Sequence, residues 1–185
     1  MSIWQHLFSI EERRNWWMRK MPPSPLRDYY EVPFPEREAD WRQVDYLALD
    51  YETTGLDEHK DEILSVGYTT IHGSCMRLAD ATHMLTRPRC MIPGESAVVH
   101  GIMDDVASSA EALEEVLPHL LRALAGKAML AHYATIEYHF LNNACKRIYG
   151  FPFVGPVVDT LALEVRVFRS QEKPIQQGDL RLANS

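Results

Sequence analysis

The sequence lacks any apolar run that approaches the roughly 18 residues of a membrane span. It also lacks a signal-peptide pattern, because Glu11 and Glu12 stand among the basic residues near the start of the chain. We therefore expect a cytoplasmic protein with no membrane span.

Cysteine is scarce, with three residues in the whole chain. Cys75, Cys90 and Cys145 are odd in number and show no CxxC spacing, so the sequence predicts neither a disulfide framework nor a zinc ribbon. A metal set made of His72, Cys75 and His83 fits no known template, and we do not expect one.

Basic residues are outnumbered, with 19 Lys and Arg against 26 Asp and Glu and a net charge of −7. This balance argues against a protein that coats nucleic acid through a broad basic surface. It does not exclude a nuclease that grips a strand end, because the positive charge of such a site comes from metal ions bound by acids. The length favours one globular domain.

The first 44 residues are predicted to form an extension to a domain that covers residues 45–185. Apolar residues at helical spacing near the start favour an amphipathic helix. Its adjacent Trp16 and Trp17 either pack onto the domain, stack on bases or lie on a membrane surface. Prolines repeat over Met21–Pro35 and remove backbone donors, so we expect an extended strap there, with no helix.

An apolar run from Tyr46 to Leu49 is typical of a buried strand. Asp50 and Glu52 follow it, and alternation along a strand places both carboxylates on one face, about 6.6 Å apart. Such charges repel unless a cation lies between them, and paired divalent ions held by carboxylates drive in-line displacement at phosphorus. Gly55 permits a sharp turn and close approach of a substrate. For a D-x-E pair alone, two acids in a solvated turn remain the alternative.

The whole string from Asp50 to Leu56 resembles the first motif, D-x-E-T-T-G-L, of the DnaQ-like (DEDDh) 3′-5′ exonucleases. This is the family of the proofreading epsilon subunit of bacterial DNA polymerase III, and every specified position of the motif matches. The resemblance implies that Asp50 and Glu52 bind two Mg²⁺ or Mn²⁺ ions. It also assigns substrate contacts to the rest of the string, namely Tyr51, Thr53, Thr54, Gly55 and Leu56.

Residues 132–141 are similar to the second motif of the family, H-N-A-x-F-D-x-x-F-L. The matches are His132, Ala134, Phe140, Leu141 and an acid at Glu137, and the departures are Tyr133 for Asn, Ile136 for Phe and Glu137 for Asp. The resemblance implies that Glu137 is a third metal-binding carboxylate and that His132 and Tyr133 contact the substrate. Two alternatives stay open: Glu137 in a first helical turn is favoured by the helix dipole without a metal, and Tyr133 packs in the core.

Two shorter segments are also similar to the family. The H-G-I segment at His100 has Met103 where the family usually has Thr, and His100 is either a substrate contact or an ordinary loop histidine. Asp159, in a D-T-L segment, is expected to cap the following helix rather than to bind metal.

Turn residues and apolar periodicity between the motifs predict the remaining elements. These are strands over 63–71 and roughly 75–87, a helix from a Ser108 cap to Gly126, a strand over 127–132, and a helix from Thr135 to about Tyr149 that Gly150 ends. A three-strand antiparallel meander followed by helix, strand and helix predicts an α/β (α+β) domain with a mixed central sheet flanked by helices. The resemblance implies the same ribonuclease H-like architecture.

The third motif of the family, H-x-A-x-x-D, has no match between Asp159 and Ser185. We therefore expect a domain truncated before its last helix, without the general-base histidine and the fourth acid, and with slower hydrolysis. Either a partner such as a polymerase supplies the missing part, or the gene is interrupted or misread there.

The leading hypothesis is a metal-dependent exonuclease that acts on the 3′ end of single-stranded nucleic acid and releases nucleoside monophosphates. The alternative is a catalytically silent nucleic-acid- or protein-binding module that retains the fold. DNA is favoured as the substrate, although no residue reads a 2′-hydroxyl recognisably.

Overall fold

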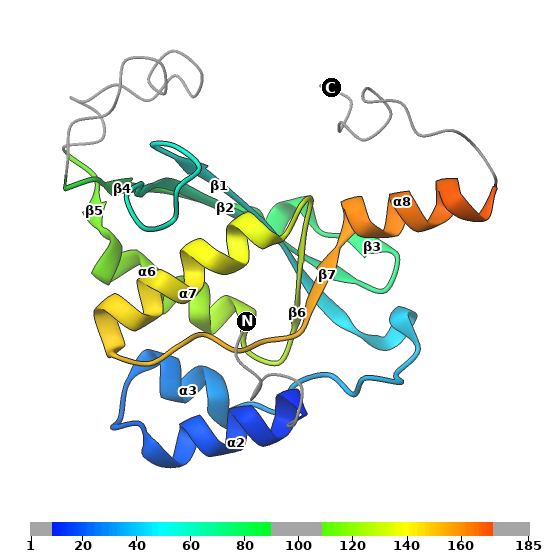
Figure 1. The fold of residues 1–185 in the computed structure, drawn as a ribbon, viewed down its shortest axis with the longest axis horizontal. Helices are drawn as coiled ribbons and strands as arrows, with labels where there is room; N and C mark the ends of the chain where they lie inside the picture. Colours follow the sequence, from blue (N-terminus) through cyan, green and yellow to red (C-terminus); the bar gives the residue numbers. More distant parts are fainter. Residues whose placement is uncertain (1–8, 90–108, 172–185) are drawn as a thin grey trace.

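The computed structural model describes residues 9–89 and 109–171, which build one mixed seven-stranded sheet with helices packed against it (Figure 1). The strands are β1 (Asp45–Thr53), β2 (Ile63–His72), β3 (Cys75–Met76), β4 (Thr82–Arg87), β5 (Glu111–Ala112), β6 (Ala128–Ala131) and β7 (Val157–Asp159). The helices are α2 (Ile10–Lys20), α3 (Pro25–Glu31), α6 (Leu113–Leu124), α7 (Thr135–Tyr149) and α8 (Thr160–Ser170), with short 3-10 turns η1 (Trp41–Gln43) and η2 (Leu78–Asp80).

The strand order is β5-β4-β2-β1-β6-β7, with β3 paired to β2. Strands β1, β2 and β4 form the predicted antiparallel meander, whereas β6 is parallel to β1 and β7 is parallel to β6. The predicted fold class, a mixed sheet flanked by helices, is therefore confirmed.

Strand β1 is central and buries one of its two faces. Leu47, Leu49 and Tyr51 point into the core beneath the helices, while Asp50 on the opposite face is exposed and Glu52 is half-buried. The expected placement of both acids on one face is confirmed. The run before them alternates instead of being buried throughout, because Tyr46 and Ala48 share the face of the acids.

Helix α7 has the predicted bounds, and Gly150 ends it in the left-handed conformation at φ 77°. Helix α6 begins at Leu113, later than predicted, because Glu111–Ala112 pairs with β4 as the short strand β5. The predicted Ser108 cap lies outside the described residues. The single strand expected over 75–87 is interrupted by η2.

The expectation that no helix forms in the proline-rich segment is wrong. Pro25 opens α3 in the first helical turn, where its missing N–H has no helical partner to lose, and the Ser24 side chain accepts from Arg27 N. Tyr29 and Tyr30 of this helix are fully buried, and Tyr30 Oη donates to Pro152 O at 2.8 Å. The segment is thus part of the main hydrophobic core.

Helix α2 packs beside α3, as Figure 1 shows in blue. Trp17 contacts Phe151 edge-on at 5.8 Å between ring centroids, whereas Trp16 is half exposed and lies beneath Lys20. Packing onto the domain is therefore confirmed for one tryptophan of the pair. Within residues 9–89 and 109–171, none of the helices has the length and apolar character of a membrane span.

Of the three cysteines, Cys75 is exposed, Cys145 is buried, and both are free thiols. Cys90 lies outside the described residues.

Candidate active site

The candidate site lies at the carboxyl ends of three neighbouring strands. Because β1, β6 and β7 run parallel, residues at their ends meet at the same edge of the sheet. Asp50 comes from β1, Asp159 from the last position of β7, and His132 directly follows β6. Helix α7 then starts at this edge and adds Glu137 from its first turn.

Glu137 is the most unusual side chain of the site. It is 5% exposed, and its Oε2 atom has no hydrogen-bond partner in the described structure. The pKa of this carboxyl is raised to about 7, chiefly by burial and also by the negative charges of Asp50 and Asp159, against the opposing effects of a backbone hydrogen bond and of His132. A buried carboxylate facing two other acids is electrostatically unfavourable until a proton or a cation neutralises it.

This orphaned oxygen fits a divalent metal, since hard cations take carboxylate oxygens as ligands. The acids do not form a closed ligand cage, however. Among the residues that the structure describes, no group of three or more His, Cys, Asp or Glu side chains is placed to hold a metal ion. The site therefore offers the right donor chemistry without a preassembled centre.

The turn after β1 is built by its own side chains. Thr53 Oγ1 donates to Gly55 O at 2.7 Å, and Thr54 Oγ1 donates to Asp61 Oδ1 at 3.0 Å. Both threonines are buried, and a Cβ at Gly55 would lie 2.4 Å from the Asp61 carboxylate. A side chain at position 55 would have to displace the Asp61 carboxylate, which is a different reason for glycine from the predicted approach of a substrate.

Tyr51, predicted to contact the substrate, instead points into the core with its side chain 7% exposed. Side chains alternate along β1, and Tyr51 lies between Asp50 and Glu52, so its side chain points to the helices while theirs point to the opposite face. Leu56, by contrast, is 76% exposed just beyond the turn. His100 lies outside the described residues.

Tyr133 and His132 join the site through Asp159 and α8. Tyr133 N donates to Asp159 Oδ1 at 3.1 Å, and the Tyr133 side chain is half exposed. His132 Nδ1 lies 3.0 Å from the hydroxyl of Thr160, which in turn donates to Ala131 O. The backbone of Tyr133 adopts φ 59°, a left-handed conformation. Asn, which is typical at this position of the resembled motif, adopts that conformation at a lower energy cost than Tyr.

Asp159, for which the sequence predicts only a helix cap, has a second role in the structure. Its Oδ1 accepts from Leu161 N at 3.0 Å and Ala162 N at 3.3 Å, which confirms the cap of α8. The negative charge of Asp159 also raises the pKa of Glu137, so Asp159 belongs to the acidic site. The signal that would have revealed this is its position at the end of a strand parallel to β6.

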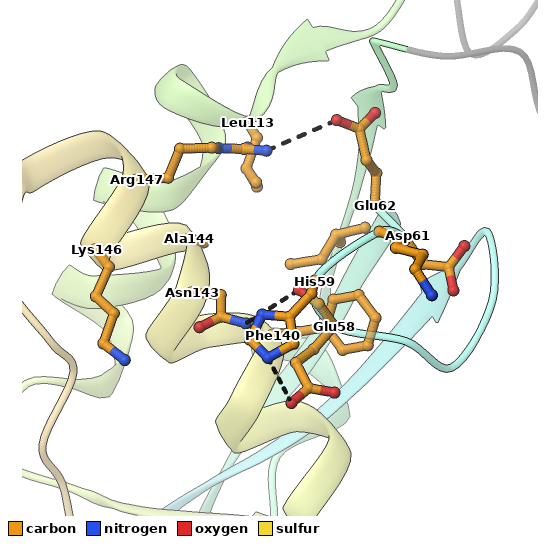
Figure 2. Close-up of a pocket in the computed structure, with 12 residues that line it drawn as sticks. Glu58, His59, Asp61, Glu62, Leu113, Phe140, Asn143, Ala144, Lys146 and Arg147 are labelled. Carbon is orange, nitrogen blue, oxygen red and sulfur yellow. Dashed lines mark hydrogen bonds and ion pairs between the residues drawn. The ribbon is translucent and has the colours of Figure 1, made fainter.

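A cleft of about 420 Å³ opens along α7 beyond Glu137, between the β1–β2 loop and the start of α6 (Figure 2). Figure 2 shows Arg147 extended toward Glu62, 3.6 Å away, with Phe140 on the cleft wall. The cleft therefore joins the loop that follows the first motif to the helix that carries Glu137.

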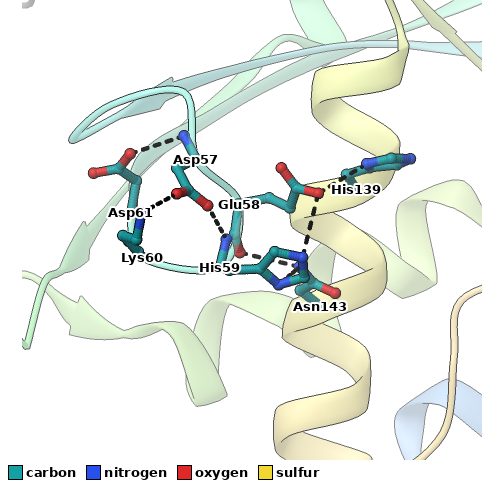
Figure 3. A network of polar contacts seen from close by, with 7 residues as sticks. All are labelled: Asp57, Glu58, His59, Lys60, Asp61, His139 and Asn143. Atoms are coloured by element: carbon teal, nitrogen blue, oxygen red, sulfur yellow. Dashed lines mark hydrogen bonds and ion pairs between the residues drawn. The ribbon is translucent and has the colours of Figure 1, made fainter.

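A polar network holds this loop to α7 (Figure 3). His139 Nδ1 lies 3.1 Å from Glu58 Oε1, and Asn143 Nδ2 donates to Glu58 O at 3.0 Å. Both contacts reach the same loop residue from one face of the helix, so the network fixes the loop that follows the first motif.

A ribonuclease H-like sheet with acids gathered at the ends of its central strands is the architecture of a nuclease domain. The family whose profile matches residues 47–183 is described as Exonuclease, and the chain belongs to it.

Two relatives illustrate the similarity. A PolC-type DNA polymerase III of Thermotoga maritima is 36% identical over 118 residues, which cover 64% of this chain and 8% of the relative. A DNA polymerase III epsilon subunit of Aquifex aeolicus is 27% identical over 69% of this chain and 62% of its own length. The chain thus spans only part of these relatives.

Solved structures of exonuclease I share the fold. A product-bound form aligns with a TM-score of 0.63 at 14% identity, covering 72% of this chain and 34% of that one. The E. coli enzyme in complex with a dT13 oligonucleotide carrying a 5cy group aligns with a TM-score of 0.64 at 13% identity, over 72% and 32% of the two chains. At such identities the similarity shows the fold alone.

Proposed function

We propose that this protein is a divalent-metal-dependent 3′-5′ exonuclease that removes nucleoside monophosphates from the end of a single strand, with DNA as the substrate. The observation that carries the proposal is the buried carboxylate of Glu137, whose Oε2 atom has no hydrogen-bond partner and whose ionisation is opposed by the charge of Asp50. The family membership and the polymerase III names of the relatives support it. Because these relatives are named as DNA polymerase III proteins, a DNA polymerase is the proposed protein partner.

Asp50, Glu52 and Glu137 are the residues that would hold Mg²⁺ or Mn²⁺. When bound, such ions supply an activated water and stabilise the leaving 3′ oxygen. The chain itself contributes the exposed Leu56 and Tyr133 as surfaces for the terminal base, and His132 as a polar contact beside Glu137. Thr53, Thr54 and Gly55 shape the turn that presents them, and His100 remains a proposed contact of the strand.

The direct test is digestion of a 5′-labelled single-stranded oligonucleotide in Mg²⁺ or Mn²⁺. We expect a ladder that shortens from the 3′ end and that disappears in Asp50→Ala. Asp45→Ala is the matched control, because this acid lies at the far end of the same strand and pairs with His72. Asp50→Ala activity within twofold of the parent would overturn the assignment.

A silent binding module is the second candidate, and the lack of a preassembled metal group among the described residues favours it. Titration calorimetry with Mn²⁺ separates the two functions. Two bound ions per chain support the enzyme, whereas a single weak site together with intact strand binding and no hydrolysis supports the module.

A further inference from the structure

One row of residues crosses three strands beside the acids. Asp50 of β1 pairs with Gly67 of β2, and Gly67 pairs with His83 of β4. Directly paired residues point to the same face of a sheet, so His83 shares the face of Asp50, and both residues are exposed. Between them, Gly67 has no side chain and leaves the backbone of the sheet bare.

The imidazole of His83 lies close to this glycine. A Cβ built at Gly67 would lie 4.0 Å from His83 Cδ2 and 3.8 Å from Asp50 O. The ring therefore lies next to the bare backbone. At about 4.8 Å between strands, the Cα atoms of Asp50 and His83 are about 10 Å apart. Gly67 is the residue between them in the row, so no side chain stands between the Asp50 carboxylate and the imidazole.

The next row of paired residues on the same face, by comparison, has a buried residue at its centre. Glu52 pairs with Ser65, which pairs with Leu85, and Ser65 is fully buried. A glycine inside a strand weakens the strand, and it often marks a place where another backbone approaches closely. Gly67 has an ordinary backbone conformation and space for a Cβ, so neither φ nor packing requires glycine there.

We propose that this row is the path of the nucleic acid strand away from the acids, with the strand lying over Gly67 and His83 donating a hydrogen bond to one of its phosphates. The proposal rests on the exonuclease function and deepens it by naming a contact upstream of the 3′ end. Imidazole carries an N–H donor in both of its charge states, and a hydrogen bond to an anionic oxygen is among the stronger kinds. Such a contact also suits a chain of net charge −7, which needs local donors to hold a polyanion.

Strand binding measured without catalysis tests the histidine. Fluorescence anisotropy of a 5′-labelled oligothymidylate in EDTA reports affinity with no metal and no hydrolysis. His83→Ala should weaken binding by at least about tenfold, the loss of roughly one hydrogen bond to a charged group. His83→Gln, which keeps an N–H donor, should recover part of the affinity. His119→Ala is the control, since that histidine is exposed on α6 and away from the row.

Gly67 gives a variant in which stability and binding separate. Gly67→Thr places a β-branched residue in a strand, so its melting temperature should equal or exceed that of the parent. The added side chain nevertheless occupies the path, and the affinity should fall by about tenfold or more. Gly67→Ala, whose Cβ makes ordinary contacts, should fold normally and show an intermediate loss.

Single methylphosphonate substitutions identify the phosphate. One uncharged linkage, at the second or third position from the 3′ end, should weaken binding to the parent but leave His83→Ala unaffected. Unchanged affinity in both His83→Ala and Gly67→Thr, with normal binding by the parent, would overturn the path and leave the exonuclease function standing. If the parent neither binds nor digests single strands, the proposed function itself fails.

Discussion

At the scale of the residue, Glu137 is a carboxyl whose ionisation the fold disfavours. Its carboxyl is buried among charges of its own sign, and its pKa is raised to about 7. An unfolded chain ionises the same group near pH 4.5. Above pH 7 the folded protein therefore holds a charge that unfolding would relieve.

Glu137→Gln should make the metal-free protein more stable at pH 8 and change nothing at pH 4.5. The raised pKa means that the neutral form is favoured in the folded state, so stability is lost as the pH rises from 4.5 through 7. With about 1.4 kcal/mol per pKa unit and a discount for solvent screening, the gain at pH 8 is about 1–3 kcal/mol. Urea unfolding in EDTA at both pH values measures it.

The exposed Glu36→Gln is the control for this measurement, because it removes a charge without touching the site. A Glu137→Gln effect of equal size at both pH values would show that the carboxyl is not strained. In the presence of Mg²⁺, Glu137→Gln lacks the proposed ligand and should require a higher Mg²⁺ concentration for activity than the parent.

Tyr133 stores strain in its backbone. It is the single non-glycine residue with positive φ in the described ranges 9–89 and 109–171. Tyr133→Asn should stabilise the protein by about 1 kcal/mol, because Asn tolerates this conformation and the half-exposed ring loses little packing. Tyr133→Phe keeps the strain and should unfold at the parent's urea midpoint, and a destabilised Asn variant would show that the ring matters more than the backbone.

At the scale of the element, α2 and α3 are joined by one buried cation. Arg14 donates to Tyr30 O, forms a 2.7 Å ion pair with Glu11, and stacks 5.6 Å from the Phe34 ring centroid. Its side chain is largely buried, so these contacts are shielded from water. The arginine therefore binds the N-terminal helices to each other and to the core.

Arg14→Ala should destabilise the protein by about 1–3 kcal/mol, because it leaves the buried carbonyl of Tyr30 without its donor. Arg14→Met fills the same space and should recover part of the loss. Arg19→Ala, at an exposed position of α2, should change the unfolding midpoint very little. Equal losses of stability in Arg14→Ala and Arg19→Ala would contradict a stabilising role for the buried contacts of Arg14.

At the scale of the whole molecule, the net charge of −7 limits how nucleic acid is held. Affinity for a single strand falls with salt by a slope of about −0.7 for each phosphate neutralised. We expect a slope no steeper than about −2 in EDTA, measured by anisotropy across a series of NaCl concentrations. A slope beyond about −4 would indicate a basic binding surface that the proposed site does not include.

Several features of the molecule follow from rules that act over a few residues. Alternation along a strand places Asp50 and Glu52 on one face, and helical periodicity with a terminal glycine sets the bounds of α7. The cap of α8 by Asp159 is another such short-range feature. These features can be predicted from the sequence because they do not depend on what lies nearby in space.

Other properties depend on pairing between distant segments, and the sequence does not predict them. The helix at Pro25 is stabilised by burial of its tyrosines against the core, which a count of prolines cannot show. The raised pKa of Glu137 arises from burial and from strands that bring Asp50 and Asp159 beside it. The row from Asp50 to His83 exists because the register of three strands aligns residues that are far apart in the chain. Sequence spacing carries no information about that register, since it is set by the packing of the whole sheet.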